Sequence, residues 1–226
     1  MMKPEFTITE ENYIKAIYVL SYEIKANNKV GTKDIATILK VQPATVTDML
    51  KKLKKKKIIH YKKYGHVQLS PSGIHYAKQL LRKHRLWETF LYEKLHFDWD
   101  EIHEIAEQLE HIQSEVLIEK LEKFLQYPQY DPHGEPIPDA MGKIPTLPDT
   151  LLSNINNKKW YTIIAIKDTS PDFLKYLRQL SIQIGTKIKL VEKIPYDDSI
   201  KLAFSNNKQI IVSGKIANNI LVTEIK

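Results

Sequence analysis

The stretch TKDIATILKVQPATVTDMLKKLKKKK, residues 32–57, predicts two short helices joined by a tight turn. Pro43 cannot continue the first helix, but it suits the first turn of the second. Apolar residues recur at helical spacing on both sides of it, with Ile35, Ala36 and Leu39 before and Val46, Leu50 and Leu53 after. The next run, IIHYKKYGHVQLS at 58–70, alternates about Gly65 as the two strands of a hairpin do. Two helices at a turn followed by a ribbon indicate a winged helix-turn-helix.

The positive charge of the chain is concentrated in this same region. Residues 43–63 hold eight lysines and one acid, Asp48, so their net charge is 8 − 1 = +7, equal to the +7 of the whole chain. A directed basic patch suits a polyanion such as DNA. A solvated lysine-rich helix and a winged helix that binds protein are the alternatives that the sequence leaves open.

A winged helix-turn-helix predicts which side chains contact duplex DNA. The N-terminal residues of the second helix enter the major groove, and basic side chains hold the phosphates. The predicted groove residues are Ala44, Thr45, Thr47 and Asp48. The predicted phosphate contacts are Lys51, Lys52, Lys55, Lys62 and Lys63.

Two long helices are expected after the hairpin. SPSG at 70–73 precedes a helix that runs to about residue 95, and a second helix runs from about Trp99 to Leu125. Along the second helix, apolar residues step by three and four residues, as a seam for another helix does: Ile102, Ile105, Leu109, Ile112 and Val116. Because twofold operators suit twofold proteins, the seam favours a homodimer. An intrachain helical core explains the same spacing.

The last third of the chain changes character. Residues 127–149 contain six prolines and two glycines, which predict a structured linker rather than a long helix. Five β-rich runs follow, at 160–168, 187–194, 199–205, 209–214 and 219–225, with a helical segment at 170–180. Several short strands in close succession predict a small antiparallel barrel. The expected fold class is mainly α with a small β domain.

The composition of the chain excludes several classes of protein and of functional site. The chain has no cysteine, which excludes disulfides and thiolate metal sites and leaves a metal to nitrogen and oxygen ligands. It has no run of 18 apolar residues, and the opening MMKPEFTITEENY is not followed by the apolar h-region of a signal peptide. We therefore expect neither membrane spanning nor secretion, and we expect a cytoplasmic location. No Gly-rich phosphate loop or H-E-x-x-H pattern is present, so no small-molecule substrate is expected.

The run HEIAEQLEHI, residues 103–112, carries a group of metal-type side chains. His103, Glu107, Glu110 and His111 stand at offsets of 0, 4, 7 and 8, and about 100° per residue puts them on one helical face. His84 and Glu88 repeat the four-residue spacing one helix earlier. Imidazole and carboxylate without thiol suit a divalent ion such as Mn(II) or Fe(II). A wet surface is the alternative, and a metalloenzyme or a constitutive DNA-binding protein with a structural metal is the rival function.

Three segments in this order carry a resemblance: RKHRLWETFL at 82–91, HEIAEQLEHI at 103–112 and DPHGEPIP at 131–138. Together they are similar to the diphtheria toxin repressor family of metal-dependent transcriptional regulators, in particular its manganese-responsive members. The resemblance implies a winged helix-turn-helix domain at 1–73, a helical dimerisation and metal-binding domain with a Pro-rich linker at 74–143, and an SH3-like barrel domain at 144–226. It also implies a homodimer whose operator binding depends on metal, and repression of metal-uptake genes.

The resemblance implies two ligand sets. The first comprises Asn12, Glu107, Glu110 and His111. The second comprises His84, Glu88, His103, Asp131, His133 and Asp168. Iron-type relatives have cysteine at the position of Glu107, so its glutamate favours Mn(II), with Fe(II) or Zn(II) as the alternatives. Lys15 stands where some manganese-type relatives have an acid, and Asn12 stands where an aspartate or methionine is usual. An amide oxygen brings no charge, so a weaker site or the recruitment of Glu11 or water is the alternative for the first set.

Overall fold

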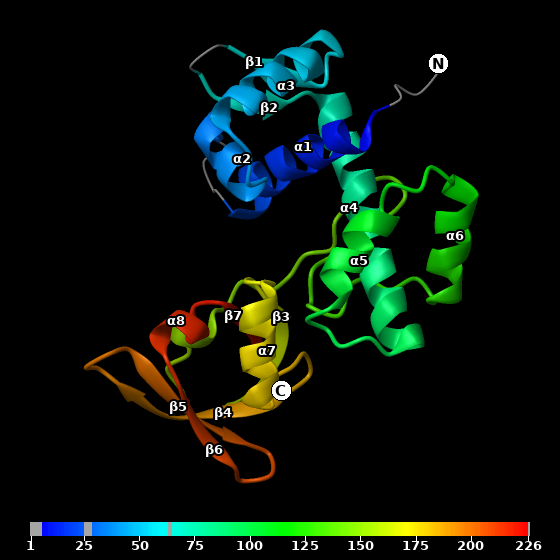
Figure 1. The fold of residues 1–226 in the computed structure, drawn as a ribbon. Helices are drawn as coiled ribbons and strands as arrows, with labels where there is room; N and C mark the ends of the chain where they lie inside the picture. The colour runs from blue at the N-terminus through cyan, green and yellow to red at the C-terminus, as the bar shows by residue number, and fades with distance from the viewer. Residues whose placement is uncertain (1–5, 25–28, 63–64, 226) are drawn as a thin grey trace. The chain divides into compact units, whose positions relative to one another are not determined.

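The computed structural model describes residues 6–24, 29–62 and 65–225 (Figure 1). The predicted phosphate contact Lys63 lies outside the described residues. Contacts divide the chain into unit 1, which comprises Met1–His84, Gln108–Ser114 and Pro138–Lys143, and unit 2, which comprises Arg85–Glu107, Glu115–Ile137 and Ile144–Lys226. The long helix α4, Pro71–Leu95, contributes its first half to unit 1 and its second half to unit 2. The domain boundaries at residues 73 and 143 stay predictions.

Unit 1 contains the predicted winged helix-turn-helix, which confirms that part of the fold class (Figure 1). Its elements before α4 are α1 (Ile8–Tyr18), a π-helical segment (Val19–Ile24), α2 (Thr32–Ile38), α3 (Pro43–Lys55), β1 (Ile59–Tyr61) and β2 (Val67–Leu69). The wing strands β1 and β2 pair antiparallel, and Val30 forms a further bridge to Val67. Pro43, which marks the predicted turn, is the first residue of α3. An amide hydrogen at this position would have no partner within the helix, so its absence from proline costs no hydrogen bond.

An apolar core orients α3 within unit 1. Val46, Leu50 and Leu53 of α3 are fully buried, together with Ile35 of α2 and Ile14 of α1. Burying one side chain of this size stabilises the fold by roughly 1.5–3 kcal/mol, so rotation of α3 about its axis is strongly disfavoured. The opposite face of α3, with its lysines, is therefore held toward solvent.

The predicted second long helix is wrong, because the structure divides it. Helix α5 spans Ile102–Leu109 and α6 spans Glu115–Phe124, with a turn between them. Ser114 directly precedes α6, and serine is favoured at the position before the first helical residue. Glu110 and His111 consequently lie in the turn beyond α5 and do not share one helical face with His103 and Glu107.

The C-terminal part of unit 2 forms the predicted five-stranded antiparallel sheet (Figure 1). The strands are β3 (Trp160–Ile166), β4 (Lys187–Ile194), β5 (Ser199–Phe204), β6 (Gln209–Val212) and β7 (Ile220–Glu224), in the order β6-β5-β4-β3-β7. A short 3-10 helix (Leu152–Asn154), α7 (Pro171–Gln179) and α8 (Gly214–Ala217) complete it. Trp99, which precedes α5, packs into the core of this domain. No helix among the described residues is long and apolar enough to cross a membrane.

Candidate metal centre

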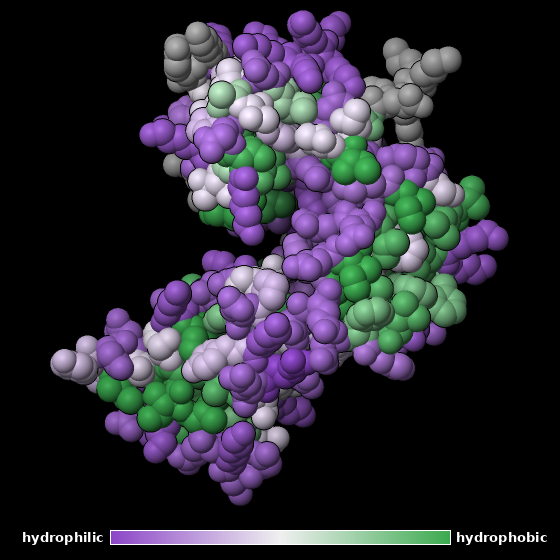
Figure 2. Space-filling model, in the orientation of Figure 1, coloured by the Kyte–Doolittle hydropathy of each residue, from purple (hydrophilic) through white to green (hydrophobic). Residues whose placement is uncertain are grey.

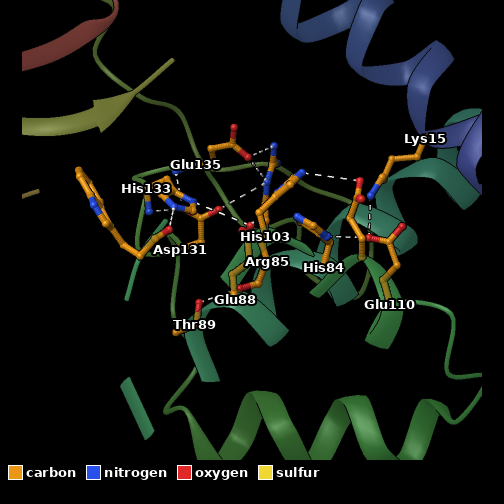
Figure 3. Close-up of polar contacts among 12 residues, drawn as sticks. Lys15, His84, Arg85, Glu88, Thr89, His103, Glu110, Asp131, His133 and Glu135 are labelled. Carbon is orange, nitrogen blue, oxygen red and sulfur yellow. Dashed lines mark hydrogen bonds and ion pairs between the residues drawn. The ribbon is translucent and has the colours of Figure 1, made fainter. Parts of the chain in front are cut away.

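Unit 2 contains a buried cluster of three ligand-type side chains. Glu88 of α4 and Asp131 and His133 of the Pro-rich linker each offer one donor atom, and these atoms all lie within 4.8 Å of one another (Figure 3). All three residues are buried. Two carboxylates and an imidazole at this separation are a donor set for a divalent ion of intermediate hardness.

The ring of His133 is fixed by backbone groups. Its Nε2 lies 2.8 Å from the Trp99 carbonyl oxygen, which can only accept, so Nε2 carries the proton. In the neutral imidazole the lone pair is then on Nδ1, which lies 3.9 Å from Glu88 Oε1. A hydrogen bond that sets the tautomer and orientation of an imidazole is the usual support of a metal-binding histidine. His133 therefore presents a ligand nitrogen to Glu88 without rearrangement.

Asp131 has one oxygen that is saturated and one that is not. Its Oδ1 accepts the backbone N–H groups of His133 (2.8 Å) and Glu135 (2.9 Å). Its Oδ2 is buried, has no hydrogen-bond partner among the described residues, and lies 3.9 Å from the Arg85 guanidinium. Burial raises the pKa of Asp131 well above its usual range, and the neighbouring charges of Glu88 and Glu135 raise it further, while Arg85 opposes them. A buried, unpartnered carboxylate oxygen calls for an explanation, and a bound cation is one.

Arg85 and Gly134 hold the linker against the rest of unit 2. Arg85 of α4 is buried, and its guanidinium donates to Glu135 Oε2 (3.0 Å) and to the Pro136 carbonyl oxygen (2.8 Å). The Ile166 N–H of β3 donates to the His133 carbonyl oxygen at 2.9 Å. Gly134 has φ +83°, and a Cβ there would lie 2.0 Å from the Ile164 carbonyl oxygen. Only glycine allows the linker to approach β3 this closely.

The remaining predicted ligands of unit 2 lie at the edge of this cluster. His103 Nδ1 is 3.1 Å from Glu88 Oε1, and His103 Nε2 is 3.6 Å from Glu107 Oε1. Glu107 is about half exposed. Asp168 follows β3, and its Oδ1 accepts the Ser170 N–H at 3.0 Å. Among the described residues, no group of three donors within 4.8 Å includes Asp168, so its role as a ligand stays a prediction.

Unit 1 contains a second buried acidic cluster, around Glu110. Its side chain is fully buried, and its Oε2 accepts hydrogen bonds from Lys15 Nζ at 2.7 Å and from His84 Nδ1 at 2.6 Å (Figure 3). Burial tends to raise the pKa of Glu110, but the hydrogen bond from His84 and the charge of Lys15 bring it below its usual value. The sequence did not identify Lys15 as the partner of Glu110, since 95 residues separate them.

The direct partner of His111 is Glu11, which was the alternative to Asn12 in the sequence analysis. Glu11, rather than the predicted Asn12, accepts from His111 Nδ1. Glu11 further accepts from Gln113 Nε2 at 2.8 Å and from the Tyr76 hydroxyl. Asn12 is half-buried beside it on α1. The first predicted ligand set therefore stays a prediction, and direct bonds already join α1 to residues 110–113.

The predicted DNA-contacting residues lie on the accessible side of α3. Ala44, Thr45, Asp48 and the four described lysines of that set (Lys51, Lys52, Lys55 and Lys62) are exposed, and Thr47 is half-buried with its hydroxyl donating to the Pro43 carbonyl oxygen. Asp48 and Lys51 form an ion pair of 2.9 Å at the surface, and the hydrogen bond from Lys51 lowers the pKa of Asp48. Hydrophilic residues cover this part of unit 1 in Figure 2.

A cavity of about 530 Å³ lies in the C-terminal part of unit 2. It is lined by Ser181, Gly185, Thr186, Lys187, Phe204, Ser205, Asn206 and Lys208. None of these lining residues is a histidine, aspartate or glutamate, so the cavity has no donor of the kind found in the two buried clusters.

Three family models match successive parts of the chain. The models described as the N-terminal DNA binding domain and the metal binding and dimerisation domain of iron dependent repressors match residues 5–67 and 70–139. A FeoA domain model matches residues 150–224. The winged helix-turn-helix, the helices with the linker, and the five-stranded sheet thus each have a counterpart.

Relatives and solved structures give the same result over longer spans. The HTH-type transcriptional regulator MntR of Listeria innocua is 33% identical over 64% of this chain and 97% of its own. The iron-dependent repressor IdeR of Mycobacterium leprae is 26% identical over 95% of this chain and 87% of its own. A solved manganese-dependent transcriptional repressor in complex with manganese superposes with a TM-score of 0.84 at 30% identity, covering 96% of this chain and all of the other.

Proposed function

This chain belongs to the iron-dependent repressor family of metal-dependent transcriptional regulators, and from that premise we propose that it is a Mn(II)-responsive repressor. It would bind an operator as a homodimer in the cytoplasm and repress genes of metal uptake. The family is one of DNA-binding regulators and not of enzymes.

The observation that carries the metal-dependent part is the Glu88, Asp131 and His133 cluster. Its donor atoms are mutually close, the neutral His133 ring has a lone pair on Nδ1, and Asp131 Oδ2 is buried without a hydrogen bond from any described residue. A divalent ion bound there would supply two positive charges to a pocket where two buried carboxylates otherwise repel each other. His103, in contact with Glu88, is the nearest further donor, and we keep Asp168 as a proposed ligand.

The donor types favour Mn(II) over a soft ion. All proposed ligands are oxygen or imidazole nitrogen, and the chain contains no cysteine. The solved relative with a TM-score of 0.84 contains manganese, which supports the same choice. Because Zn(II) binds most nitrogen and oxygen sites more tightly than Mn(II), selectivity has to rest on geometry and metal supply. Fe(II) and Zn(II) remain the alternative activating ions.

The cluster joins parts of the chain that are far apart in sequence. Glu88 lies on α4, which begins two residues after the wing strand β2, whereas Asp131 and His133 lie on the linker that β3 holds through Ile166. Holding their side chains together restricts how α4 and the linker move. A change in the population of DNA-binding arrangements from about 1:99 to 99:1 needs about 5.5 kcal/mol of differential affinity, which a multidentate site can supply.

An exposed apolar surface on unit 2 supports the homodimer. Tyr92 and Leu95 near the end of α4, Val116 and Leu117 at the start of α6, and Phe124 at its end are all exposed. Figure 2 shows hydrophobic residues at the surface around α5 and α6. Exposed apolar side chains in such numbers mark an interaction surface, and twofold pairing of a repressor fits a twofold operator.

Operator binding with and without metal tests the proposal. Duplexes selected from a random pool in the presence of Mn(II) provide the probe, and their affinity is measured with Mn(II), Fe(II), Zn(II) and a chelator. We expect Mn(II) to tighten binding at least tenfold, equivalent to about 1.4 kcal/mol. Glu88→Gln should lose this response, while the exposed control Glu192→Gln on β4 should keep it. Equal affinity in chelator and in Mn(II) would contradict the proposal.

A further inference from the structure

The ammonium group of Lys15 forms an ion pair with the buried carboxylate of Glu110 in unit 1. Its ammonium lies 2.7 Å from Glu110 Oε2, with 13% of the lysine side chain exposed and none of the glutamate. The same oxygen is 2.6 Å from His84 Nδ1. One carboxylate oxygen thus already has two donors, and one of them is an ammonium group.

The donor atoms left over in this cluster are few. His111 donates through Nδ1 to Glu11, which leaves its Nε2 lone pair, 3.8 Å from Glu110 Oε1. Glu110 Oε1 has no hydrogen-bond partner. Asn12 can add only a neutral amide oxygen. Both oxygens of Glu11 already accept hydrogen bonds, from His111, Gln113 and Tyr76. Mn(II) takes about six ligands in octahedral sites, so two remaining donor atoms and an amide do not make its coordination shell.

We propose that Lys15 is the resident cation of this cluster, so that Glu110 and His111 hold no metal ion and each chain binds one ion only. The single ion is the one at Glu88, Asp131 and His133, and this half of the inference rests on the proposed function. The residues around Glu110 do not fit a divalent ion as they stand. An ion on Glu110 Oε1 would share its carboxylate group with the Lys15 ammonium on Oε2, and the two like charges would repel each other.

The same contacts have a structural consequence for α1. Lys15 with Glu110, and Glu11 with His111 and Gln113, join α1 to the turn that follows α5 through direct bonds. Removing one partner from a buried ion pair is costly because it leaves the other charge uncompensated. The link between α1 and residues 110–113 therefore persists in protein stripped of metal, and the response to Mn(II) is a single binding step per chain.

Counting bound ions tests the inference. Native mass spectrometry and elemental analysis of the full chain in excess Mn(II) should give one ion per chain for the wild type. Lys15→Glu removes the ammonium and adds a carboxylate, and should give two. The matched control Lys33→Glu, an exposed charge reversal on α2, should give one. Glu88→Gln should give none, and Glu110→Gln should leave the count at one.

A second measurement does not depend on counting ions. The ammonium group of a buried, ion-paired lysine gives a slowly exchanging proton–nitrogen NMR signal, and Lys15→Arg assigns it. We expect this signal to persist after saturation with diamagnetic Zn(II). Its loss on loading, or two ions in the wild type with one lost in Glu110→Gln, would overturn the inference and leave the proposed function intact. No bound ion in the wild type would overturn the proposed function itself.

Discussion

Replacing Gly134 with alanine should weaken Mn(II) binding without touching a ligand. Gly134 stands between His133 and Glu135 in the linker, with φ +83°. An added methyl group would lie 2.0 Å from the Ile164 carbonyl oxygen and 2.6 Å from Ala165 Cα. Real Cβ contacts do not fall below 3.0 Å, so the linker has to move away from β3 by at least 1.0 Å.

The size of the effect follows from that displacement. A shift of 1.0 Å is several times the roughly 0.2 Å tolerance of metal–ligand distances, and it carries both His133 and Asp131 with it. It also breaks the hydrogen bond from Ile166 N–H to the His133 carbonyl oxygen, which contributes about 1 kcal/mol. Changes in the support of metal ligands typically lower affinity about 10- to 100-fold, and we expect this range for Mn(II).

Gly185 supplies the matched control for the backbone conformation. Its φ is +84°, and no heavy atom lies within 4 Å of an added Cβ. Both substitutions thus carry the left-handed penalty of about 1–2 kcal/mol, and only Gly134→Ala carries the clash. Titration calorimetry with Mn(II) and urea unfolding of both variants separate the two effects. If Gly134→Ala binds Mn(II) as tightly as Gly185→Ala, the linker does not position the ligands and the reasoning is refuted.

Three further predictions follow from burial and charge. In chelator, Asp131→Asn should stabilise the protein relative to the wild type, and increasingly so as pH rises above about 4. The pKa of Asp131 is raised in the folded state, so the wild type loses stability as this carboxyl ionises. Parallel pH profiles of the two proteins in urea unfolding would contradict this. Lys52→Ala should reduce the slope of log affinity for duplex DNA against log salt by about 0.9, whereas Lys208→Ala in the barrel should not change the slope. Phe124→Glu should convert the dimer to a monomer in sedimentation experiments, and an unchanged mass would place the interface elsewhere.

The elements were predictable where local pattern decides them. Periodicity and the positions of Pro and Gly predict the turn at Pro43, the wing about Gly65 and all five strands of the C-terminal sheet. These signals act over a few residues. The division between α5 and α6 was missed because the apolar spacing continues through it. The spacing of Ile112 and Val116 fits a helix, but the chain turns at residues 110–114 to place Glu110 under Lys15 and His84. A tertiary contact overrides the local pattern there.

The candidate site was predictable in its residue types but not in its partners. His84, Glu88, His103 and the DPHG segment were singled out by chemistry and resemblance. The roles of the Trp99 carbonyl oxygen and of Arg85 had no sequence signal, because a backbone acceptor looks the same in every residue and an arginine looks like any other surface charge. Their roles exist only once α4 and the linker are packed together.

The two buried acidic clusters differ in how the charge of their carboxylates is compensated. A carboxylate removed from water has to be compensated, by hydrogen bonds, by an internal cation or by a bound one. Glu110 has Lys15 and His84 on the same oxygen. Asp131 has two backbone N–H donors on Oδ1 and the Arg85 guanidinium 3.9 Å from Oδ2. The bonds of that guanidinium to the linker hold it at this distance. The negative charges of Glu88 and Glu135 act on Asp131 against that one guanidinium, so sensitivity to an external ion is expected at this cluster rather than at Glu110.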